Sequence, residues 1–497
     1  MHDILTALEQ FAGKYDGAVI FSDDLRVLTR NSLALLALRT AATLKDVPDV
    51  IGILCENSVE AAVCQLAGWA AGKHVVPLPY FFTEGQLGHA IRDAGITHCL
   101  TSDRMRDLAF RLGLTAVQIK TLSTPLCQAI RGGGQIIYTS GSTGAPKGVR
   151  LSLDQINSST RQLAQLTGAT ASDRYLSILP LPLLLETICA ICVPVITSAK
   201  THFDREATGA VARGDPSLIA DAFARHTPSA SVLVPELLAA WTAQLARTKR
   251  RAPSTLRFVA VGGAPVPAPL AAAAWQRGIP AYEGYGLSEC CAVVSLNAPG
   301  SRRAGTVGRP LPELSVSIED GEIVVEGPTL MNGYVNAVDT PARWRTGDLG
   351  EFDSDGYLHV RGRRDNLIVT SFGRNISPEW IEGMLLADPR FSAAAIIGHG
   401  EPALTALLVP SKMGAVWLEQ APRAHVLLAL TSACRDAPNY ALPRDFLVVS
   451  RTQISKHNLM TANGRWRRST LADAVKDLRA ARASQNSITE QPKELTA

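Results

Sequence analysis

This chain of 497 residues lacks the features that mark a nucleic-acid-binding protein. It has no long run of basic side chains, and its net charge is only +4, from 49 Lys and Arg against 45 Asp and Glu. A protein that binds nucleic acid through charge usually carries a larger basic excess or a basic patch. We therefore expect no nucleic-acid partner.

The chain also lacks an uninterrupted apolar run. Its most apolar stretch, Leu176 to Ala199, contains three prolines and Glu186, whereas a membrane span needs about 20 continuous apolar residues. The stretch instead predicts a buried strand, turn and helix. The first ten residues, MHDILTALEQ, do not resemble a secretory signal. We predict a cytoplasmic protein with no membrane span, and a peripheral membrane contact stays open.

Cysteine is scattered rather than clustered. The nine cysteines form only two close pairs, Cys189-x-x-Cys192 and Cys290-Cys291. A structural zinc site needs a second pair at matching spacing. Cys189 and Cys192 lie in an apolar stretch, so we interpret them as small core residues. The pattern is typical of a reducing compartment.

Short apolar runs alternate with helical patterns over most of the chain. Val50–Cys55 predicts a buried strand, which a helix capped by Asn57 or Ser58 follows. The alternation recurs from Ala230 to Val261. Such alternation predicts parallel sheets covered by helices, and the length predicts at least two domains. A charged junction, Arg361–Asn366, then leads into a smaller region of mixed α and β character, and the last twenty or so residues are polar.

The stretch from Ile136 to Arg150, IIYTSGSTGAPKGVR, has the composition of a loop that cradles phosphate. An apolar, β-prone run leads into Ser, Thr and Gly residues, whose hydroxyl and N–H groups are donors. Lys147 follows these residues and supplies a point charge. It is not a Walker A loop, because Lys147 follows Pro and precedes Gly. The other predicted phosphate-binding residues are Thr139, Ser140, Gly141, Ser142, Thr143 and Gly144.

This stretch resembles, nearly letter for letter, the [ST]-S-G-[ST]-T-G-x-P-K-G signature of the adenylate-forming enzymes: acyl-CoA synthetases, carrier-loading adenylation domains and luciferases. Further segments resemble motifs of the same family in the same order. They are Val261-Gly-Gly-Ala-Pro265, Tyr282-Glu-Gly-Tyr-Gly-Leu-Ser-Glu289, Trp344-Arg-Thr-Gly-Asp348, and Gly362-Arg-Arg-Asp365 with Gly373-Arg-Asn-Ile-Ser-Pro-Glu379.

The resemblance implies roles for residues of the second of these segments. Tyr285 would stack on adenine, Ser288 would bond a phosphate oxygen, and Glu289 would hold Mg²⁺ and act with Lys147 in catalysis. Further nucleotide-binding residues implied by the motifs are Gly263, Ala264, Pro265, Glu283, Gly284 and Gly286.

The resemblance also implies how the two domains work. Asp348 would accept both ribose hydroxyls, Arg363 would contact the nucleotide, and Asp365 would be the hinge about which a C-terminal lid rotates. The expected fold is α/β, with helix-covered, mostly parallel sheets, a small β-rich subdomain and a small mobile α+β lid. The predicted boundaries are 1–362 for the ATP- and acid-binding domain, 363–366 for the hinge, 367–475 for the lid and 476–497 for a disordered tail.

The implied reaction has two steps. A carboxylate attacks the α-phosphate of ATP, which gives acyl-AMP and pyrophosphate, and the acyl group then passes to a thiol or amine. The acid is already ionised near neutral pH, so catalysis rests on positioning and on spreading the phosphoryl charge. The implied cofactors are ATP, Mg²⁺ and CoA, or the phosphopantetheine of a carrier protein.

One motif departs from the family. The C-terminal [TN]-x-x-G-K motif is matched by Thr461-Ala-Asn-Gly-Arg465, so Arg465 stands where the family has its adenylation Lys. Arg465 can bridge a carboxylate and a phosphate in place of Lys. Lys456, nine residues upstream, is a second candidate. The third alternative is impaired adenylation.

The segment Leu179-Pro-Leu-Pro-Leu-Leu-Leu-Glu-Thr-Ile188 stands where the family's acyl-pocket helix begins. This segment and the phrase YEGYGLSE resemble the bacterial long-chain acyl-CoA synthetases, which predicts a medium- or long-chain fatty acid as substrate. The predicted pocket residues are Leu183, Leu184, Glu186 and Gly262. The leading hypothesis is therefore a fatty acyl-CoA synthetase. A ligase that loads an acyl carrier protein or forms an amide, and a nucleotide-binding pseudoenzyme, are the alternatives.

Overall fold

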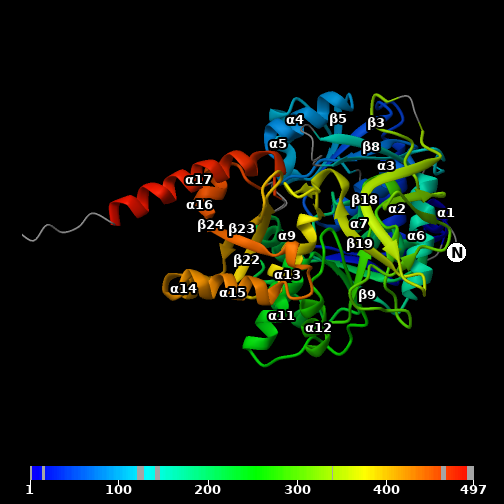
Figure 1. Ribbon diagram of the computed structural model, residues 1–497. Coiled ribbons are helices and arrows are strands. Elements are labelled where there is room, and N and C mark those ends of the chain that lie inside the picture. Colours follow the sequence, from blue (N-terminus) through cyan, green and yellow to red (C-terminus); the bar gives the residue numbers. More distant parts are fainter. Residues whose placement is uncertain are drawn as a thin grey trace, which may run out of the picture. The chain divides into compact units, whose positions relative to one another are not determined.

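The computed structural model describes residues 3–13, 17–119, 128–139, 146–337, 340–460 and 466–489. The chain divides into two compact units, whose elements are labelled in Figure 1. The larger unit comprises Met1–Thr346 and Glu351–Val360, and the smaller comprises Gly347–Gly350 and Arg361–Ala497. The rotation of a lid about Asp365 stays a prediction.

The larger unit is built on two sheets of mostly parallel strands. One has the order β15-β14-β13-β12-β11-β9-β10-β1-β2, and the other has the order β6-β5-β3-β4-β7-β8. The first contains β1 (Val19–Asp23), β2 (Val27–Thr29), β9 (Arg174–Ser177), β10 (Lys200–Phe203), β11 (Ala230–Leu233), β12 (Phe258–Val261), β13 (Ala281–Tyr285), β14 (Ser295–Leu296) and β15 (Arg309–Pro310). The second contains β3 (Val50–Leu54), β4 (His74–Pro77), β5 (His98–Thr101), β6 (Thr115–Val117), β7 (Gly134–Thr139) and β8 (Lys147–Ser152).

Helices supply the crossovers that parallel neighbours need. The helices described in this unit are α1 (Ile4–Ala12), α2 (Arg30–Ala42), α3 (Val59–Ala70), α4 (Glu84–Asp93), α5 (Arg106–Arg111), α6 (Leu153–Thr167), α7 (Leu184–Thr187), α8 (Val193–Thr197), α9 (Arg205–Ala212), α10 (Ile219–His226), α11 (Pro235–Arg247) and α12 (Ala268–Gln276). A third sheet, which forms the small β-rich part, has the order β16 (Ser315–Glu319), β17 (Glu322–Glu326), β18 (Arg343–Phe352), β19 (Leu358–Arg363). The predicted α/β class with a small β-rich part is confirmed.

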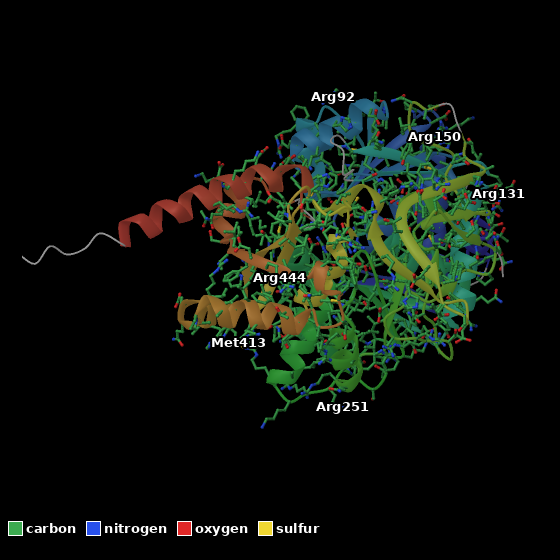
Figure 2. The ribbon with its side chains drawn as sticks, in the orientation of Figure 1. Arg92, Arg131, Arg150, Arg251, Met413 and Arg444 are labelled. Carbon is green, nitrogen blue, oxygen red and sulfur yellow. The ribbon has the colours of Figure 1, made fainter. Side chains whose placement is uncertain are left out.

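Polar side chains set the ends of several elements. Ser58 caps α3, because its hydroxyl accepts the N–H of Ala61 at 3.1 Å. Asn57, the other predicted cap, instead donates to the carbonyl of Leu179 at 2.6 Å and accepts the N–H of Leu181 at 2.7 Å. Asn57 therefore connects the loop after β3 to the segment 179–188, where the sequence predicts that the acyl-pocket helix begins. At the N-terminus, Arg131, labelled in Figure 2, donates to Asp3 at 2.9 Å and pairs with Glu9 at 3.1 Å.

The apolar stretch from Leu176 to Ala199 has the predicted strand, turn and helix. The end of β9 leads into α7, a π-helical turn at Ile188–Cys192, and α8. Cys192 is fully buried, as expected of a core residue. Across the part of the chain that the structure describes, no helix is long and apolar enough to cross a membrane.

The smaller unit has a three-stranded sheet with an apolar cluster on each face. The strands are β22 (Phe391–Ile397), β23 (Leu404–Pro410) and β24 (Pro443–Val448), beside a short pair, β20 (Ile368–Val369) and β21 (Asn375–Ile376). Alternate residues of β23 face opposite ways, so Leu408 joins one cluster and Leu407 the other. The helices are α13 (Pro378–Leu385), α14 (Lys412–Gln420), α15 (Arg423–Ala433), α16 (Arg451–Lys456) and α17 (Arg468–Thr489).

The disordered tail expected from residue 476 stays a prediction. Residues 476–489 continue α17. This helix begins with Leu471, Val475 and Leu478 buried against the sheet, and that packing stabilises a helix far more than its own propensity does.

Candidate active site

Lys147 is the first residue of β8 in the β7–β8 hairpin and follows residues 140–145 in the sequence. The two strands are antiparallel, and Thr139 pairs with Lys147 in the register. Gly148 leaves little room for a larger residue, because a Cβ would lie 2.7 Å from a methyl carbon of Val335 and 2.9 Å from the ring of Tyr138, and one of these side chains would have to shift. The predicted residues Ser140, Gly141, Ser142, Thr143 and Gly144 lie outside the described residues, and only the backbone of Thr139 is described.

Tyr334 connects two residues that the sequence assigned to catalysis. The ammonium nitrogen of Lys147 lies 5.4 Å from the centroid of the Tyr334 ring, and the Tyr334 hydroxyl donates to Glu289 Oε1 at 2.9 Å. A cation over an aromatic face is attracted by the ring. Backbone bonds fix the arrangement, since Val335 N–H donates to Gly148 and Met331 N–H donates to Glu289. Lys147 and Glu289 therefore belong to one site.

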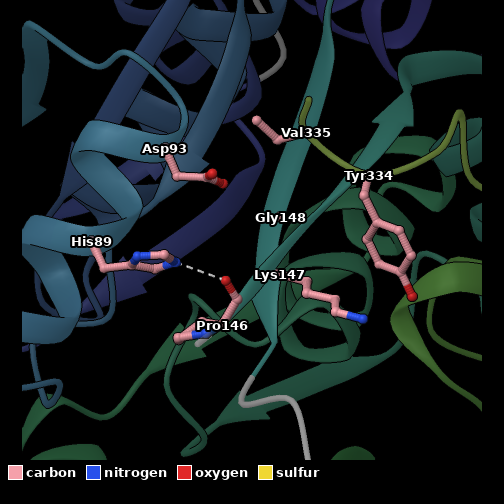
Figure 3. Close-up of a pocket in the computed structure, with 7 residues that line it drawn as sticks. All are labelled: His89, Asp93, Pro146, Lys147, Gly148, Tyr334 and Val335. Atoms are coloured by element: carbon pink, nitrogen blue, oxygen red, sulfur yellow. Dashed lines mark hydrogen bonds between the residues drawn. The ribbon is translucent and has the colours of Figure 1, made fainter. Parts of the chain in front are cut away.

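A pocket of about 430 Å³ opens beside this group (Figure 3). Lys147 and Tyr334 line it from one side, and His89 and Asp93 of α4 line it from the other. The exposed ammonium group of Lys147, with the half-buried carboxylate of Glu289 on the other side of the Tyr334 ring, suits a phosphate ligand and its metal ion. Mg²⁺ is commonly held by one or two carboxylates together with substrate phosphates, so Glu289 fits the predicted ligand role, which stays a prediction.

A second group of predicted residues gathers at the carboxyl ends of β12 and β13. These strands are parallel neighbours with Val261 opposite Glu283, and ligands of open α/β sheets bind at such ends. Gly262 lies against the backbone of Gly284, whose carbonyl oxygen would be 3.3 Å from a Cβ. Burial raises the pKa of Glu283 to about 7, although the nearby charge of Arg302 opposes the rise.

The residues that follow β13 are held by tight backbone packing. A Cβ on Gly286 would lie 1.9 Å from the carbonyl oxygen of Ala292, so no other residue fits. The carbonyl of Tyr285 accepts the N–H of Val294 at 2.8 Å. Tyr285 and Ser288 are partly buried, while Gly263, Ala264 and Pro265 are exposed after β12. The structure thus brings these motif residues to one sheet edge, and their contacts with nucleotide stay predictions.

In the smaller unit, Asp348 and Arg363 form an ion pair. Arg363 Nη1 donates to Asp348 Oδ1 at 3.2 Å, and the Arg363 guanidinium is 4.0 Å from Asp365. Gly347 has φ of +73°, and a Cβ there would meet the guanidinium at 2.9 Å. The structure therefore brings the predicted ribose-binding and nucleotide-binding residues together, next to the predicted hinge residue.

The predicted acyl-pocket residues occupy different environments. Leu184 and Glu186 are buried, and Leu183 is partly buried. Tyr175 donates its hydroxyl to Glu186 Oε2 at 2.9 Å. Burial raises the pKa of Glu186 to about 8, against the opposing hydrogen bonds of Ser177 and Tyr175. Glu186 is thus held largely protonated at neutral pH, and its place in an acyl pocket stays a prediction.

Arg465 lies outside the described residues, but both flanks of its segment are anchored. Met460 pairs with Trp466 in a β-bridge, and Trp466 Nε1 donates to the carbonyl of Ala394 at 2.7 Å. Arg468 donates to both oxygens of Glu382, at 2.6 Å each. The basic cluster at the end of the motif is therefore partly structural. Lys456, the alternative to Arg465, is exposed on α16.

Sequence reasoning missed Tyr334 and His89. Tyr334 lies in the short stretch MNGYVN, and His89 is a single histidine on a helix. Neither belongs to a spaced pattern of chemical groups, so only the pairing of residues 332–335 with β8 and the packing of α4 reveal their position.

The fold and the matched family models agree on the class of protein. Residues 8–129 and 135–335 match the model described as AMP-binding enzyme. Residues 365–478 match the model described as AMP-binding enzyme C-terminal domain. The chain therefore belongs to the AMP-binding enzyme family. The predictions of an enzyme and of the adenylate-forming superfamily are confirmed.

Three comparisons describe the relatives. The chain is 26% identical over 449 residues to the 2-succinylbenzoate–CoA ligase of Bacillus subtilis, covering 84% of this chain and 87% of the relative. It is 38% identical over 159 residues to a long-chain-fatty-acid–CoA ligase of Mycobacterium bovis, covering 31% and 26%. The structure of the B. subtilis o-succinylbenzoate coenzyme A synthetase in complex with ATP and magnesium ion matches with a TM-score of 0.77 at 24% identity, covering 94% and 99%. These relatives are named as acid–CoA ligases, which is the class of enzyme predicted from the sequence. The predicted CoA appears in their names, and the solved complex contains the predicted ATP and magnesium ion.

Proposed function

We propose that this enzyme is an AMP-forming ligase that joins an apolar carboxylic acid to coenzyme A. The observation that carries the proposal is the row Lys147, Tyr334 and Glu289 at the end of the β7–β8 hairpin, in a chain that matches both domains of the AMP-binding enzyme family. A cation and a carboxylate one aromatic ring apart suit a polyphosphate and its Mg²⁺ ion.

The first step forms an acyl-adenylate. A carboxylate oxygen of the acid attacks the α-phosphorus of ATP, the bond to the bridging oxygen breaks, and pyrophosphate leaves with its electron pair. Lys147 would offset the charge on the phosphate oxygens, which is the electrostatic stabilisation that dominates phosphoryl transfer. Asp348 and Arg363 would hold the ribose and the nucleotide.

The second step forms the thioester. The sulfur of CoA attacks the acyl carbon, the bond to the phosphate oxygen breaks, and AMP leaves. The thiol proton passes to solvent. We propose CoA rather than a carrier protein as the acceptor, because the relatives described above are named for CoA.

For the acid, we propose an aromatic or similarly compact substrate. The support is the succinylbenzoate ligase, which matches over most of both chains. The fatty acid predicted from the sequence is the second candidate, and the fatty-acid ligase that supports it matches over less than a third of this chain. A cytoplasmic location remains part of the proposal.

Pyrophosphate release from ATP and Mg²⁺ tests the proposal, using a panel of aromatic and fatty acids with and without CoA. We expect acid-dependent release without CoA and faster turnover with it. Lys147→Ala should lower the rate about 100-fold or more, whereas Lys200→Ala, an exposed lysine on β10, should not. No release with any acid would contradict the proposal, and a fatty acid as the preferred acid would favour the second candidate.

A further inference from the structure

One face of helix α4 contacts both flanks of residues 140–145. His89 and Asp93 are four residues apart, so their side chains project from the same face. The hydroxyl of Tyr138, next to the end of β7, donates to Asp93 Oδ2 at 2.7 Å. His89 Nε2 lies 2.9 Å from the carbonyl oxygen of Pro146, immediately before Lys147 (Figure 3). The helix therefore binds the strand that enters this segment and the residue that leaves it.

The chemistry of the partners fixes the direction of both bonds. A carbonyl oxygen only accepts, so His89 must carry a proton on Nε2, which it does both in one neutral tautomer and as imidazolium. Tyr138 is buried, and its burial and its bond to Asp93 raise its pKa, which keeps the hydroxyl a donor. The His89 and Tyr138 rings also meet edge to face, with centroids 6.3 Å apart.

Asp93 extends the contact to the segment that carries Tyr334. Its second oxygen, Oδ1, accepts the amide of Asn336 at 3.1 Å. Asn336 has φ of +64°, a left-handed conformation that Asn tolerates better than most residues. The same segment pairs with β8 through Val335. One carboxylate thus joins α4 to the hairpin and to the segment that places Tyr334 beside Lys147 and Glu289.

We propose that His89 and Asp93 are positioning residues for the phosphate-binding hairpin, with Tyr138 as their partner. This inference rests on the proposed function. The three side chains hold the backbone on which Lys147 stands, so that its ammonium group meets the phosphates without a prior rearrangement. Their loss should weaken the use of ATP more than the use of the acid.

Steady-state kinetics of pyrophosphate release test the proposal with four variants. His89→Leu removes the donor, His89→Gln keeps an N–H donor, and Tyr138→Phe removes only the hydroxyl. Arg92→Gln changes an exposed neighbour on α4 and is the control (Figure 2). We expect His89→Leu and Tyr138→Phe to raise the KM for ATP about tenfold, with the KM for the acid and the melting temperature as in the control. His89→Gln should restore most of the loss.

Hydrogen exchange of residues 146–152 in nucleotide-free protein gives a readout that does not need activity. Exchange should be faster in His89→Leu than in His89→Gln and Arg92→Gln. An unchanged KM for ATP and unchanged exchange would overturn the positioning role. An equal rise in both KM values with a lower melting temperature would also overturn it, since that indicates only a structural role. If wild-type protein releases no pyrophosphate with any acid, the proposed function fails, and the exchange data alone decide the positioning role.

Discussion

The two units each bury a glutamate, and they stabilise it in different ways. Glu186, in the larger unit, has the hydroxyls of Tyr175 and Ser177 as its polar neighbours, and burial raises its pKa to about 8. Glu382, in the smaller unit, binds the Arg468 guanidinium through both oxygens and accepts the N–H of Ile396 at 2.6 Å. Burial also raises the pKa of Glu382, and the charge of Arg468 opposes it.

The difference teaches that burial alone favours the neutral acid, whereas a paired guanidinium allows the ion to remain. An isolated charge in the interior is costly unless it is paired and hydrogen-bonded. The ion pair of Glu382 with Arg468 holds the chain at the flank of the motif that contains Arg465. The neutral Glu186 lies in the segment that follows β9.

Removing one partner of the ionic pair should have the largest effect. Arg468→Ala leaves Glu382 buried without its counter-charge, and we expect a loss of about 3–5 kcal/mol in the free energy of unfolding. Denaturant unfolding of the full chain checks this. Arg435→Ala, whose side chain is 81% exposed, should change it by less than about 0.5 kcal/mol. A similar loss in both variants would show that the pair does not anchor the segment.

Arg465→Ala should separate the catalytic arginine from the anchoring one. If Arg465 replaces the family's Lys, adenylation should fall by about 100-fold or more, while transfer from preformed acyl-AMP should change little. Pyrophosphate release and thioester formation measured separately check this, with Lys456→Ala beside it. Equal losses in both half-reactions would assign Arg465 a structural role.

The neutral glutamate predicts a pH dependence of stability. The folded pKa of Glu186 is raised from 4.5 to about 8, so its contribution is fully present below pH 4.5 and is lost as pH rises toward 8. The slope should approach about 1.4 kcal/mol per pH unit. Glu186→Gln should remove this pH dependence. The free energies of unfolding of wild type and variant should therefore diverge by a few kcal/mol between pH 5 and 8. Parallel curves for wild type and variant would show that Glu186 is ionised when folded.

The comparison between charged and neutral partners extends to the predicted nucleotide site. Asp348→Ala removes the partner of Arg363 and the predicted ribose acceptor, so we expect ATP affinity to fall about 10- to 100-fold. Calorimetric titration with ATP measures it, with Asp388→Ala, which pairs with Arg390 in the same unit, as control. Unchanged affinity would remove the ribose assignment.

The smallest effect should come from a neutral contact. Tyr334→Phe keeps the ring beside Lys147 and removes only the hydroxyl that donates to Glu289. We expect kcat to fall by about fivefold, because one hydrogen bond contributes about 1 kcal/mol. Single-turnover adenylation checks this, and Tyr440→Phe, half exposed in the smaller unit, is the matched change. A loss as large as that of Lys147→Ala would give the hydroxyl a direct part in the reaction.

Local patterns in the sequence accounted for most of the elements and for the family. The strand at Val50–Leu54 and the alternation of strands and helices between Ala230 and Val261 were both expected, because side-chain periodicity and capping are properties of neighbouring residues. The composition of residues 476–489 did not indicate a helix, because these residues are mostly polar and α17 packs on the sheet through the apolar residues near its start, Leu471, Val475 and Leu478.

By itself, the sequence determined the α/β class, the adenylate-forming family and the motif residues Lys147, Glu289, Asp348 and Arg363, since each rests on the order of nearby residues along the chain. Only the tertiary structure decided that Tyr334 lies between Lys147 and Glu289, that His89 and Asp93 bind the hairpin, and that Arg468 pairs with Glu382. The physical reason is that these contacts join residues far apart in sequence, and sheet pairing and helix packing, not spacing along the chain, bring them within hydrogen-bonding distance.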